Sequence, residues 1–392
     1  MGKNKKVPEI RFKGFEGEWE EKELGSEVAE IIGGGTPNTA IPAYWDGGID
    51  WYSPTEIGNE VYASGSDKKI TELGLKKSSA KLLPAERTIL FTSRAGIGDT
   101  AILKRDGTTN QGFQSLVLKK GFDTYFIYTS GHLIKRFAEK HSSGSTFLEI
   151  SGKMLGRMLL STPSAKEQSH IGIFFQNLDA LISLHQRKHD KLSTVKKAML
   201  EKMFPKEGEN VPEIRFKGFT GKWNEQIISE ICLISTGKSN TQDRIENGPY
   251  PFYVRSPIVE RSQRYLYDEE AVLTVGDGVG TGKVFHYVNG KYDLHQRVYR
   301  IFGFKGILGK FFYYYFSCFF YDRVMSMTAK TSVDSIRLDM ISDMKIKLPP
   351  DIKEQQNIVA TFQHLDSLIS LHQRELDKLK NIKKACLEKM FV

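Results

Sequence analysis

The chain contains one large module written twice. The segment VPEIRFKGF occurs at residues 7–15 and again, letter for letter, at residues 211–219. Toward the other end of each copy, SLHQR occurs at residues 183–187 and 370–374. A repeat of this size fixes how many units the fold must contain, so it constrains every later inference. Similar ends and dissimilar middles predict a shared frame that carries two different middle domains.

Each copy is predicted to have three parts: an extended lead-in with a turn, a middle domain and a long helix. Strand-like runs such as TILFTS and AVLTVGDG alternate with Gly-rich turns and some helical stretches, which is typical of an α+β domain. The predicted boundaries are a first domain with its lead-in at 1–163, a helix at 164–204, a second lead-in and domain at 205–350, and a second helix at 351–392.

The two helices carry heptad seams that are polar at the same central place. We predict that they zip together as an antiparallel coiled coil, with the two domains at opposite ends of a rod about 60 Å long and related by a pseudo-twofold axis. Pro205 ends the first helix. The alternative is that each helix packs only on its own domain. The predicted seam residues are Ile171, Leu178, Leu181, His185, Leu192 and Val195 in the first helix, and Ile358, Leu365, Leu368, His372, Leu379 and Ile382 in the second.

Composition favours a polyanionic partner and a reducing compartment. The net charge is +9 and the 392 residues contain three cysteines, without a CxxC pair, so neither disulfides nor a zinc site are expected. The apolar run at 311–321 is too short to cross a bilayer as a helix. The start MGKNKK is not followed by an apolar stretch as in a signal peptide. We expect a cytoplasmic protein.

The candidate catalytic motifs all fail. GDGVGTGK at 276–283 has Asp277 where a phosphate-binding loop needs Gly, and Val284 where it needs Ser or Thr. NGPY at 247–250 has Gly248 where the Asn-Pro-Pro-Tyr motif of amino-methyltransferases has Pro. His185 and His189 lie one helical turn apart, but the second copy does not repeat the pair. The chain is therefore predicted to catalyse nothing by itself and to hold no metal.

Recognition remains, and each middle domain offers a polar loop for it. The sequences are GTTNQGF at 107–113 and KYDLHQR at 291–297. Asn and Gln can bond adenine in the major groove and Arg can bond guanine, while surrounding basic residues suit phosphates. The alternative for any single residue is an ordinary solvated loop side chain. The predicted DNA contacts are Arg94, Lys104, Arg105, Asn110 and Gln111 in the first domain, and Lys238, Arg244, Arg255, Arg261, Arg264, Lys283, His295, Gln296 and Arg297 in the second.

These motifs, in this order and present twice, resemble the specificity (S) subunit of type I restriction–modification systems. The resemblance rests on the VPEIRF lead-in followed by Gly and Trp, the Gly turns with N-Q and H-Q loops, the Pro-x-x-x-Glu-Gln helix starts at 163–168 and 350–355, and the LEKMF ends. It covers essentially the whole chain in both halves.

The resemblance implies two target recognition domains, each reading one half of a split, asymmetric site in double-stranded DNA. The helices would act as an antiparallel spacer and as the dock for two methyltransferase (M) subunits, which carry S-adenosylmethionine and methylate adenine. Two restriction (R) subunits can join to give a nuclease and translocase that depends on ATP and Mg. The chain itself would be non-catalytic and bind no cofactor.

Two competing interpretations remain at this stage. One is a duplicated coiled-coil scaffold that joins other proteins and has no sequence-specific DNA binding. The other is a complete methyltransferase, although the sequence offers no site for the methyl donor.

Overall fold

The chain forms two compact units, each containing one middle domain and part of both long helices. The first unit comprises Met1–Gln186 and Arg374–Val392, and the second comprises Arg187–Gln373. The long helices, predicted as separate segments 164–204 and 351–392, are therefore shared between the units. The computed structural model describes residues 6–58, 60–94, 96–144, 148–278, 280–327 and 335–392.

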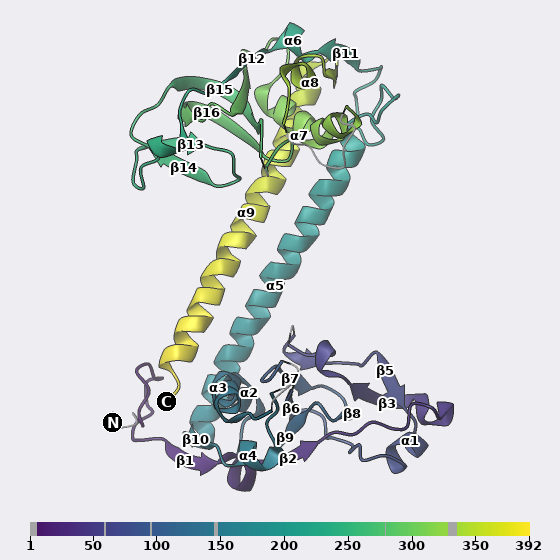
Figure 1. The fold of residues 1–392 in the computed structure, drawn as a ribbon, viewed down its shortest axis with the longest axis vertical. Coiled ribbons are helices and arrows are strands. Elements are labelled where there is room, and N and C mark those ends of the chain that lie inside the picture. Colours follow the sequence, from purple (N-terminus) through teal and green to yellow (C-terminus); the bar gives the residue numbers. More distant parts are fainter. Residues whose placement is uncertain (1–5, 59, 95, 145–147, 279, 328–334) are drawn as a thin grey trace. The chain divides into compact units, whose positions relative to one another are not determined.

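The first unit contains two sheets and a two-stranded ladder (Figure 1). Its strands are β1 (Glu20–Glu23), β2 (Ala29–Gly33), β3 (Trp45–Tyr52), β4 (Tyr62–Ala63), β5 (Lys68–Ile70), β6 (Thr88–Phe91), β7 (Thr100–Leu103), β8 (Gly107–Thr109), β9 (Gln114–Leu118) and β10 (Leu159–Thr162). The five-stranded sheet has the order β2–β9–β6–β7–β4, the three-stranded sheet has the order β5–β3–β8, and β1 pairs with β10. Every residue of β6 is buried. Ile89, Leu90 and Phe91 are apolar, and the Thr88 hydroxyl donates to the carbonyl of Pro84 at 2.6 Å.

The second unit repeats this plan with a single larger sheet. Its strands are β11 (Asn224–Ile227), β12 (Leu233–Thr236), β13 (Tyr250–Tyr253), β14 (Val259–Ser262), β15 (Tyr267–Val275), β16 (Phe285–Leu294), β17 (Val298–Phe302) and β18 (Lys345–Leu348). The six-stranded sheet has the order β12–β17–β15–β16–β13–β14, and β11 pairs with β18 as β1 pairs with β10. In both units a parallel pair, β3 with β8 and β13 with β16, lies beside the candidate recognition loop.

The helices cover the sheets and connect the units. Their bounds are α1 (Glu72–Lys76), α2 (Thr124–Thr129), α3 (Gly131–His141), α4 (Gly152–Gly156), α5 (Ala165–Met203), α6 (Ile228–Ile231), α7 (Gly309–Ser326), α8 (Leu338–Ser342) and α9 (Ile352–Lys389), with short helical turns η1 (Leu24–Val28), η2 (Pro42–Tyr44), η3 (Pro54–Glu56) and η4 (Thr241–Asp243). Residues 125–141 form two helices rather than one, because the helix is interrupted between α2 and α3 at Ser130.

Each lead-in is clasped to the start of the helix in its own copy by the same buried ion pair. The Arg11 guanidinium donates to Glu167 through Nε at 2.7 Å and Nη2 at 2.8 Å. Arg215 does the same to Glu354 at 2.6 and 2.8 Å. Both glutamates are 1% exposed, and two parallel bonds to a buried carboxylate fix geometry as well as charge. The Arg in VPEIRF and the Glu in the helix-start motif are thus partners.

The end of each long helix completes the core of the domain that belongs to the other copy. Phe391, just past α9, lies 5.6 Å from Phe126 in a stacked contact and 5.9 Å from Phe175 near the start of α5. Phe204, just past α5, stacks 6.0 Å from Phe362 near the start of α9. The start of one helix therefore meets the end of the other in each unit, which is an antiparallel pairing. The predicted α+β fold with an antiparallel helix pair is confirmed.

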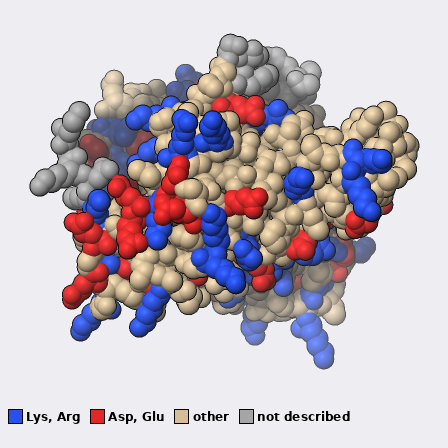
Figure 2. Space-filling model, turned by 90° about the horizontal axis from the view of Figure 1, so that it is seen from below, with Lys and Arg blue, Asp and Glu red and all other residues tan. Residues whose placement is uncertain are grey.

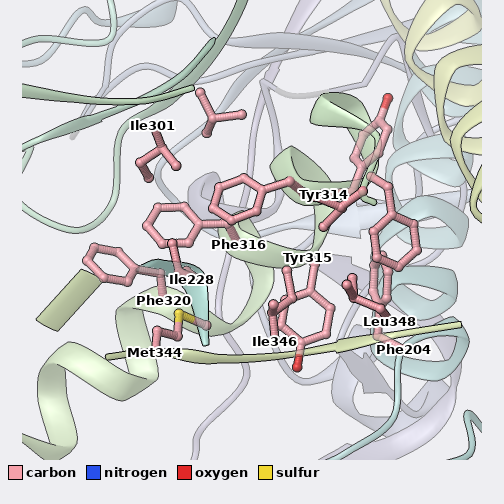
Figure 3. Packing of buried hydrophobic residues seen from close by; sticks show 14 of the residues in the cluster. Phe204, Ile228, Ile301, Tyr314, Tyr315, Phe316, Phe320, Met344, Ile346 and Leu348 are labelled. Atoms are coloured by element: carbon pink, nitrogen blue, oxygen red, sulfur yellow. The ribbon is translucent and has the colours of Figure 1, made fainter. Parts of the chain in front are cut away.

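Figure 3 shows how this arrangement fills the core of the second unit. Phe204 lies among aromatic side chains of α7, including Tyr315, and beside Leu348 of β18. Its ring is 5.5 Å from that of Phe311 and 5.4 Å from that of Tyr315. The aromatic run at 311–321, which is too short to span a bilayer, therefore lies in α7 and contributes its buried rings to this core.

A Lys–Asp–Tyr cluster ties the two helices together once in each unit. In the first unit the Lys383 ammonium on α9 lies 2.6 Å from Asp179 on α5, and the Tyr125 hydroxyl donates to the same carboxylate at 2.8 Å. In the second unit Lys196 on α5 pairs with Asp366 on α9, which accepts from Tyr314 at 2.7 Å. Burial, followed by the charge of the nearby aspartate, raises the pKa of Tyr125. This tyrosine therefore stays protonated and donates.

In α5, one of the two interleaved sets of predicted seam positions differs from the observed positions by one residue. The structure buries or half-buries every seventh predicted position: Ile171, Leu178, His185 and Leu192. The interleaved positions lie one residue later than predicted, because Leu181 is 45% and Val195 39% exposed, while the adjacent Ile182 and Lys196 are half-buried. A polar seam residue such as Lys196 cannot be found from an apolar repeat.

The second helix shows the same shift. The predicted positions Ile358, Leu365, His372 and Leu379 are buried or half-buried. Ile382 is 39% exposed, whereas Leu376, which was not predicted, is 1% exposed. The predicted Leu368 is half-buried beside the half-buried Ile369, and Lys383 is the half-buried neighbour of Ile382. Because Leu368 and Ile369 are adjacent and both apolar, the sequence does not show which of them belongs to the seam.

Replacing either terminal phenylalanine tests whether each helix end completes the core of the other copy's domain. We expect Phe391→Ala to lower the free energy of unfolding by roughly 3–5 kcal/mol and to raise amide exchange in the first unit, including residues around Phe126. Phe204→Ala should act in the second unit. The control is Leu159→Ala, since Leu159 is 61% exposed and its loss should change stability by less than about 0.5 kcal/mol. Faster exchange confined to the opposite unit would contradict the arrangement.

The two lysines should differ in their contribution to stability. The Asp179 side chain is 8% exposed and that of Asp366 is 39% exposed. Lys383→Ala leaves a buried carboxylate without its cation, so we expect a loss of about 3 kcal/mol. Lys196→Ala leaves a solvated carboxylate and should cost about 1 kcal/mol or less. Denaturant unfolding of the two variants provides the comparison, and equal losses would show that burial of the aspartate does not decide the effect.

Candidate nucleic-acid interface

The candidate loop of the first unit leaves β8 and is anchored at both ends by backbone hydrogen bonds. The Asn110 N–H donates to the carbonyl of Tyr52, at the end of β3, with a length of 3.0 Å. At the other end of the loop, the carbonyl of Gly112 accepts from the Ser93 N–H at 2.8 Å. The loop is therefore fixed between the ends of β3 and β6.

The candidate loop of the second unit leaves β16 and has the same anchors. The His295 N–H donates to the Tyr253 carbonyl, at the end of β13, at 3.0 Å, and the Arg297 carbonyl accepts from the Gly276 N–H at 2.8 Å. Residues 110–112 and 295–297 thus occupy corresponding places in two similar frames. One frame presents Asn-Gln-Gly and the other His-Gln-Arg.

A glycine-containing segment packs against the backbone of each loop. A Cβ at Gly34 would lie 1.9 Å from the Asn110 carbonyl oxygen, and a Cβ at Gly237 would lie 2.2 Å from that of Leu294. Any larger residue at either position would collide with backbone atoms. The glycines therefore bring segments 34–36 and 237–240 against the loops, and each segment contributes a polar side chain there.

Those side chains hold the one residue that the loops share. In the first unit the Thr36 hydroxyl donates to Oε1 of Gln111. In the second, Nε2 of Gln296 donates to Oδ1 of Asn240 at 2.6 Å. Both glutamines are exposed, so their amides are oriented from within the protein and still reach solvent. An oriented amide is suited to pairing with a base edge.

The second loop also carries a cluster of charged groups that the first loop lacks. Asp277, just after β15, lies 3.3 Å from Arg255 and 3.7 Å from Arg297. His295 is 4% exposed and its Nδ1 accepts from the Arg297 N–H at 3.0 Å. Burial, with the charge of Arg255 adding to it, lowers the pKa of His295. This histidine is therefore neutral near pH 7 and supports the loop instead of adding charge.

The remaining basic residues of the first unit are split between two places. Arg94 pairs its backbone with Glu149 and lies beside the Ser93 anchor of the loop. Lys104 and Arg105 lie in the turn between β7 and β8, at the end of β8 that is away from the loop. There Lys104 pairs with Glu86 and Arg105 with Asp50. The structure thus brings Arg94, Asn110 and Gln111 together and separates Lys104 and Arg105 from them.

Most of the predicted basic residues of the second unit already hold a partner within their own unit. Lys238 donates its backbone N–H to Leu294, next to the loop, and the Lys283 ammonium lies 4.9 Å from the ring centre of Tyr321. The other three lie on or beside the β13–β14 hairpin: Arg244 pairs with Glu260, Arg264 pairs with Asp243, and Arg261 donates to the carbonyls of Gly248 and Pro249. Arg261 in particular braces the hairpin.

Three polar residues that position these loops were not predicted. Thr36 and Asn240 follow glycines in the sequence, and Asp277 lies in the Gly turn that was considered only as a failed phosphate loop. Their signal is visible once the two copies are aligned on their loops, since each lies close to a glycine. Residues 95 and 279, which lie near these loops in the sequence, are outside the described part of the chain.

Positive charge alone does not identify a DNA-binding surface in the view of Figure 2. There, Lys and Arg side chains are interspersed with Asp and Glu side chains. Among the residues that the structure describes, no group of three or more His, Cys, Asp and Glu side chains could hold a metal ion. Within the same residues, no helix combines the length and the apolar character needed to cross a membrane.

Comparison with known proteins agrees with this geometry. The sequence model of the type I restriction modification DNA specificity domain matches residues 16–194 and 220–381. The chain is 26% identical over 403 residues to the type I restriction enzyme MjaIX specificity subunit of Methanocaldococcus jannaschii, covering 95% of this chain and 92% of that protein. It is 33% identical over 181 residues to the EcoR124I/EcoR124II specificity subunit of Escherichia coli, covering 44% of this chain and 43% of that one.

Solved structures show the same fold. The crystal structure of the S subunit of a type I restriction–modification system from M. genitalium superposes with a TM-score of 0.67 over 98% of this chain and 99% of that one, at 15% identity. The family match covers both copies of the repeat, and each match includes a middle domain and most of a long helix. The chain belongs to the family of type I restriction–modification DNA specificity subunits.

Proposed function

We propose that this specificity subunit reads a split, asymmetric site in double-stranded DNA, one half with each candidate loop. The observation that carries the proposal is the pair of equivalent anchors, Asn110 to Tyr52 and His295 to Tyr253, which hold unlike tripeptides in like frames. Equivalent placement directs both loops to the same kind of target. Unlike side chains at the tips require that the two half-sites differ in sequence.

The chain would act by positioning other subunits. By family likeness its partners are two M subunits, which carry S-adenosylmethionine and methylate adenine, and optionally two R subunits, which use ATP and Mg. With these partners, we propose that it works in the cytoplasm, where the DNA is. The subunit itself contributes base recognition and geometry, and it binds none of these cofactors.

The surface of the repeat supports two identical partners. On the long helices, Leu184 is 38% exposed and Leu371 is 44% exposed, and both belong to the repeated SLHQR segment. A large apolar side chain exposed at equivalent positions of both copies is typical of a protein interface. We propose that one M subunit covers each of these positions.

The long helices would also set the gap between the half-sites. α5 has 39 residues and α9 has 38, so each is roughly 57–59 Å long at 1.5 Å per residue. Two weak half-site contacts joined by a stiff connection bind as one strong contact only when the spacing of the half-sites matches. The length of the helices then decides which DNA sites are used.

Binding to duplex DNA should be steeply sensitive to salt. If the complex of the chain with M subunits makes six to ten phosphate contacts, its affinity should fall by about 10³–10⁵ between 50 and 200 mM salt. A mobility-shift titration at several salt concentrations measures this slope, and mapping methylated adenines in cells with and without the gene identifies both half-sites. A flat response, or an unchanged methylation map, would favour a scaffold without DNA specificity.

Lengthening both helices should widen the preferred gap. Seven residues inserted into α5 and seven into α9, within the two SLHQR segments, keep the heptad register and add roughly 10 Å. At about 3.4 Å per base pair, the gap between half-sites should grow by about three base pairs while the half-site sequences stay the same. The control is a seven-residue insertion at Gly208, between the two copies, which should leave the gap unchanged. An unaltered gap in the helix variant would refute the spacer role.

A further inference from the structure

The corresponding tripeptides of the two candidate loops, 110–112 and 295–297, differ most at their third position, where Arg297 corresponds to Gly112. We propose that Arg297 reads a guanine in the half-site bound by the second unit, that Asp277 positions its guanidinium, and that the first unit makes no such contact. This inference rests on the proposed function, and it names one specificity-determining residue and one base for it.

The backbone of Arg297 is fixed on both sides while its side chain stays accessible. Its N–H donates to the ring of the buried His295 at 3.0 Å, and its carbonyl accepts from Gly276 at 2.8 Å. The side chain is 64% exposed. A rigid Cα with an exposed long side chain is the arrangement needed for a base contact, because the loop does not have to be ordered when DNA binds.

Asp277 restrains the guanidinium without burying it. Its Oδ2 lies 3.7 Å from Nε of Arg297, and its Oδ1 lies 3.3 Å from Nη1 of Arg255. The aspartate side chain is only 25% exposed, so it lies beneath two more exposed arginines. A carboxylate near Nε orients the guanidinium and leaves its terminal nitrogens available for a bidentate contact.

The first unit is built to exclude this contact. A Cβ on Gly112 would lie 2.8 Å from Cγ of Pro54 and 3.0 Å from Oδ1 of Asn110, so the position has no room for a longer side chain. Arg94, next to the Ser93 anchor, stands where the second unit has Asp277, next to its Gly276 anchor. The carboxylate that would orient an arginine is therefore also missing from that position.

Guanine is the base that matches an oriented guanidinium. Its O6 and N7 accept two parallel hydrogen bonds in the major groove, and arginine is the side chain that most often makes this contact. The neighbouring glutamine is common to both loops, so it does not distinguish the half-sites. Arg297 therefore accounts for a difference between them that Gln111 and Gln296 cannot supply.

The test uses the full-length chain assembled with its M subunits. Binding is selected from a duplex library in which both half-sites are randomised, and affinities are then measured for the four base pairs at each selected position. For Arg297→Ala we expect the preference for guanine to fall by between about 5-fold and 150-fold at a single base pair, with every other preference retained. Arg297→Lys keeps the charge but not the planar fork, so it should lose the same preference.

Asp277→Asn tests the positioning role separately. It should reduce discrimination at the same base pair by less than Arg297→Ala, while binding to random duplex does not weaken, because the substitution removes a negative charge. The matched control is Lys345→Ala. The Lys345 side chain is 63% exposed and its ammonium lies 2.7 Å from Glu225, so its loss removes an exposed cation and its ion pair without altering the preference assigned to Arg297. Gln111→Ala identifies which half-site belongs to the first unit.

The outcomes separate this inference from the proposed function. Loss of one guanine preference, in the half-site that Gln111→Ala leaves unchanged, supports the assignment. Retention of every preference by Arg297→Ala, or a loss in the half-site of the first unit, overturns the assignment and leaves the proposed function standing. A wild-type complex that selects no sequence at all overturns both.

Discussion

Each unit of this protein depends on the end of a helix that belongs to the other copy of the repeat. Phe391 and Phe204 enter the two cores, and the Lys383–Asp179 and Lys196–Asp366 pairs hold each helix end against the start of its neighbour. Because the core is incomplete without that helix end, neither copy can form its own core alone. The residues that make this pairing lie in the repeated ends of the two copies, such as LEKMF, whereas the middle domains differ in sequence.

The proposed function rests on that division between frame and loop. The Arg11–Glu167 and Arg215–Glu354 clasps are the same in both copies, and so are the backbone anchors of the loops. What differs lies at the tips, where the second unit has a charged cluster around Asp277 and the first has a glycine without space for a side chain. Under the proposed function, the frame would fix where a target is read, and the loop residues would fix which target is read.

The sequence was sufficient for the repeat, the α+β class, the long helices and the family, because these depend on repeated motifs and periodicity. It did not predict the polar residues that hold the structure together. Lys196 and Lys383 occupy seam positions that an apolar pattern assigns to their neighbours, and Lys104 and Arg105 are close in sequence to the first loop but lie at the other ends of short strands. Thr36, Asn240 and Asp277 act through contacts that bring distant segments together, so their only signal in the sequence is the glycine near each of them.

The most direct measurement of the central claim is an experimental structure of the chain, assembled with its M subunits, on a duplex that contains its methylated site. The account predicts that Gln111 contacts base edges in one half-site and that Gln296 and Arg297 contact base edges in the other. It also predicts that Phe204 and Phe391 remain in the cores where they lie now. A complex in which both loops face solvent, while the DNA lies on another surface, would contradict it.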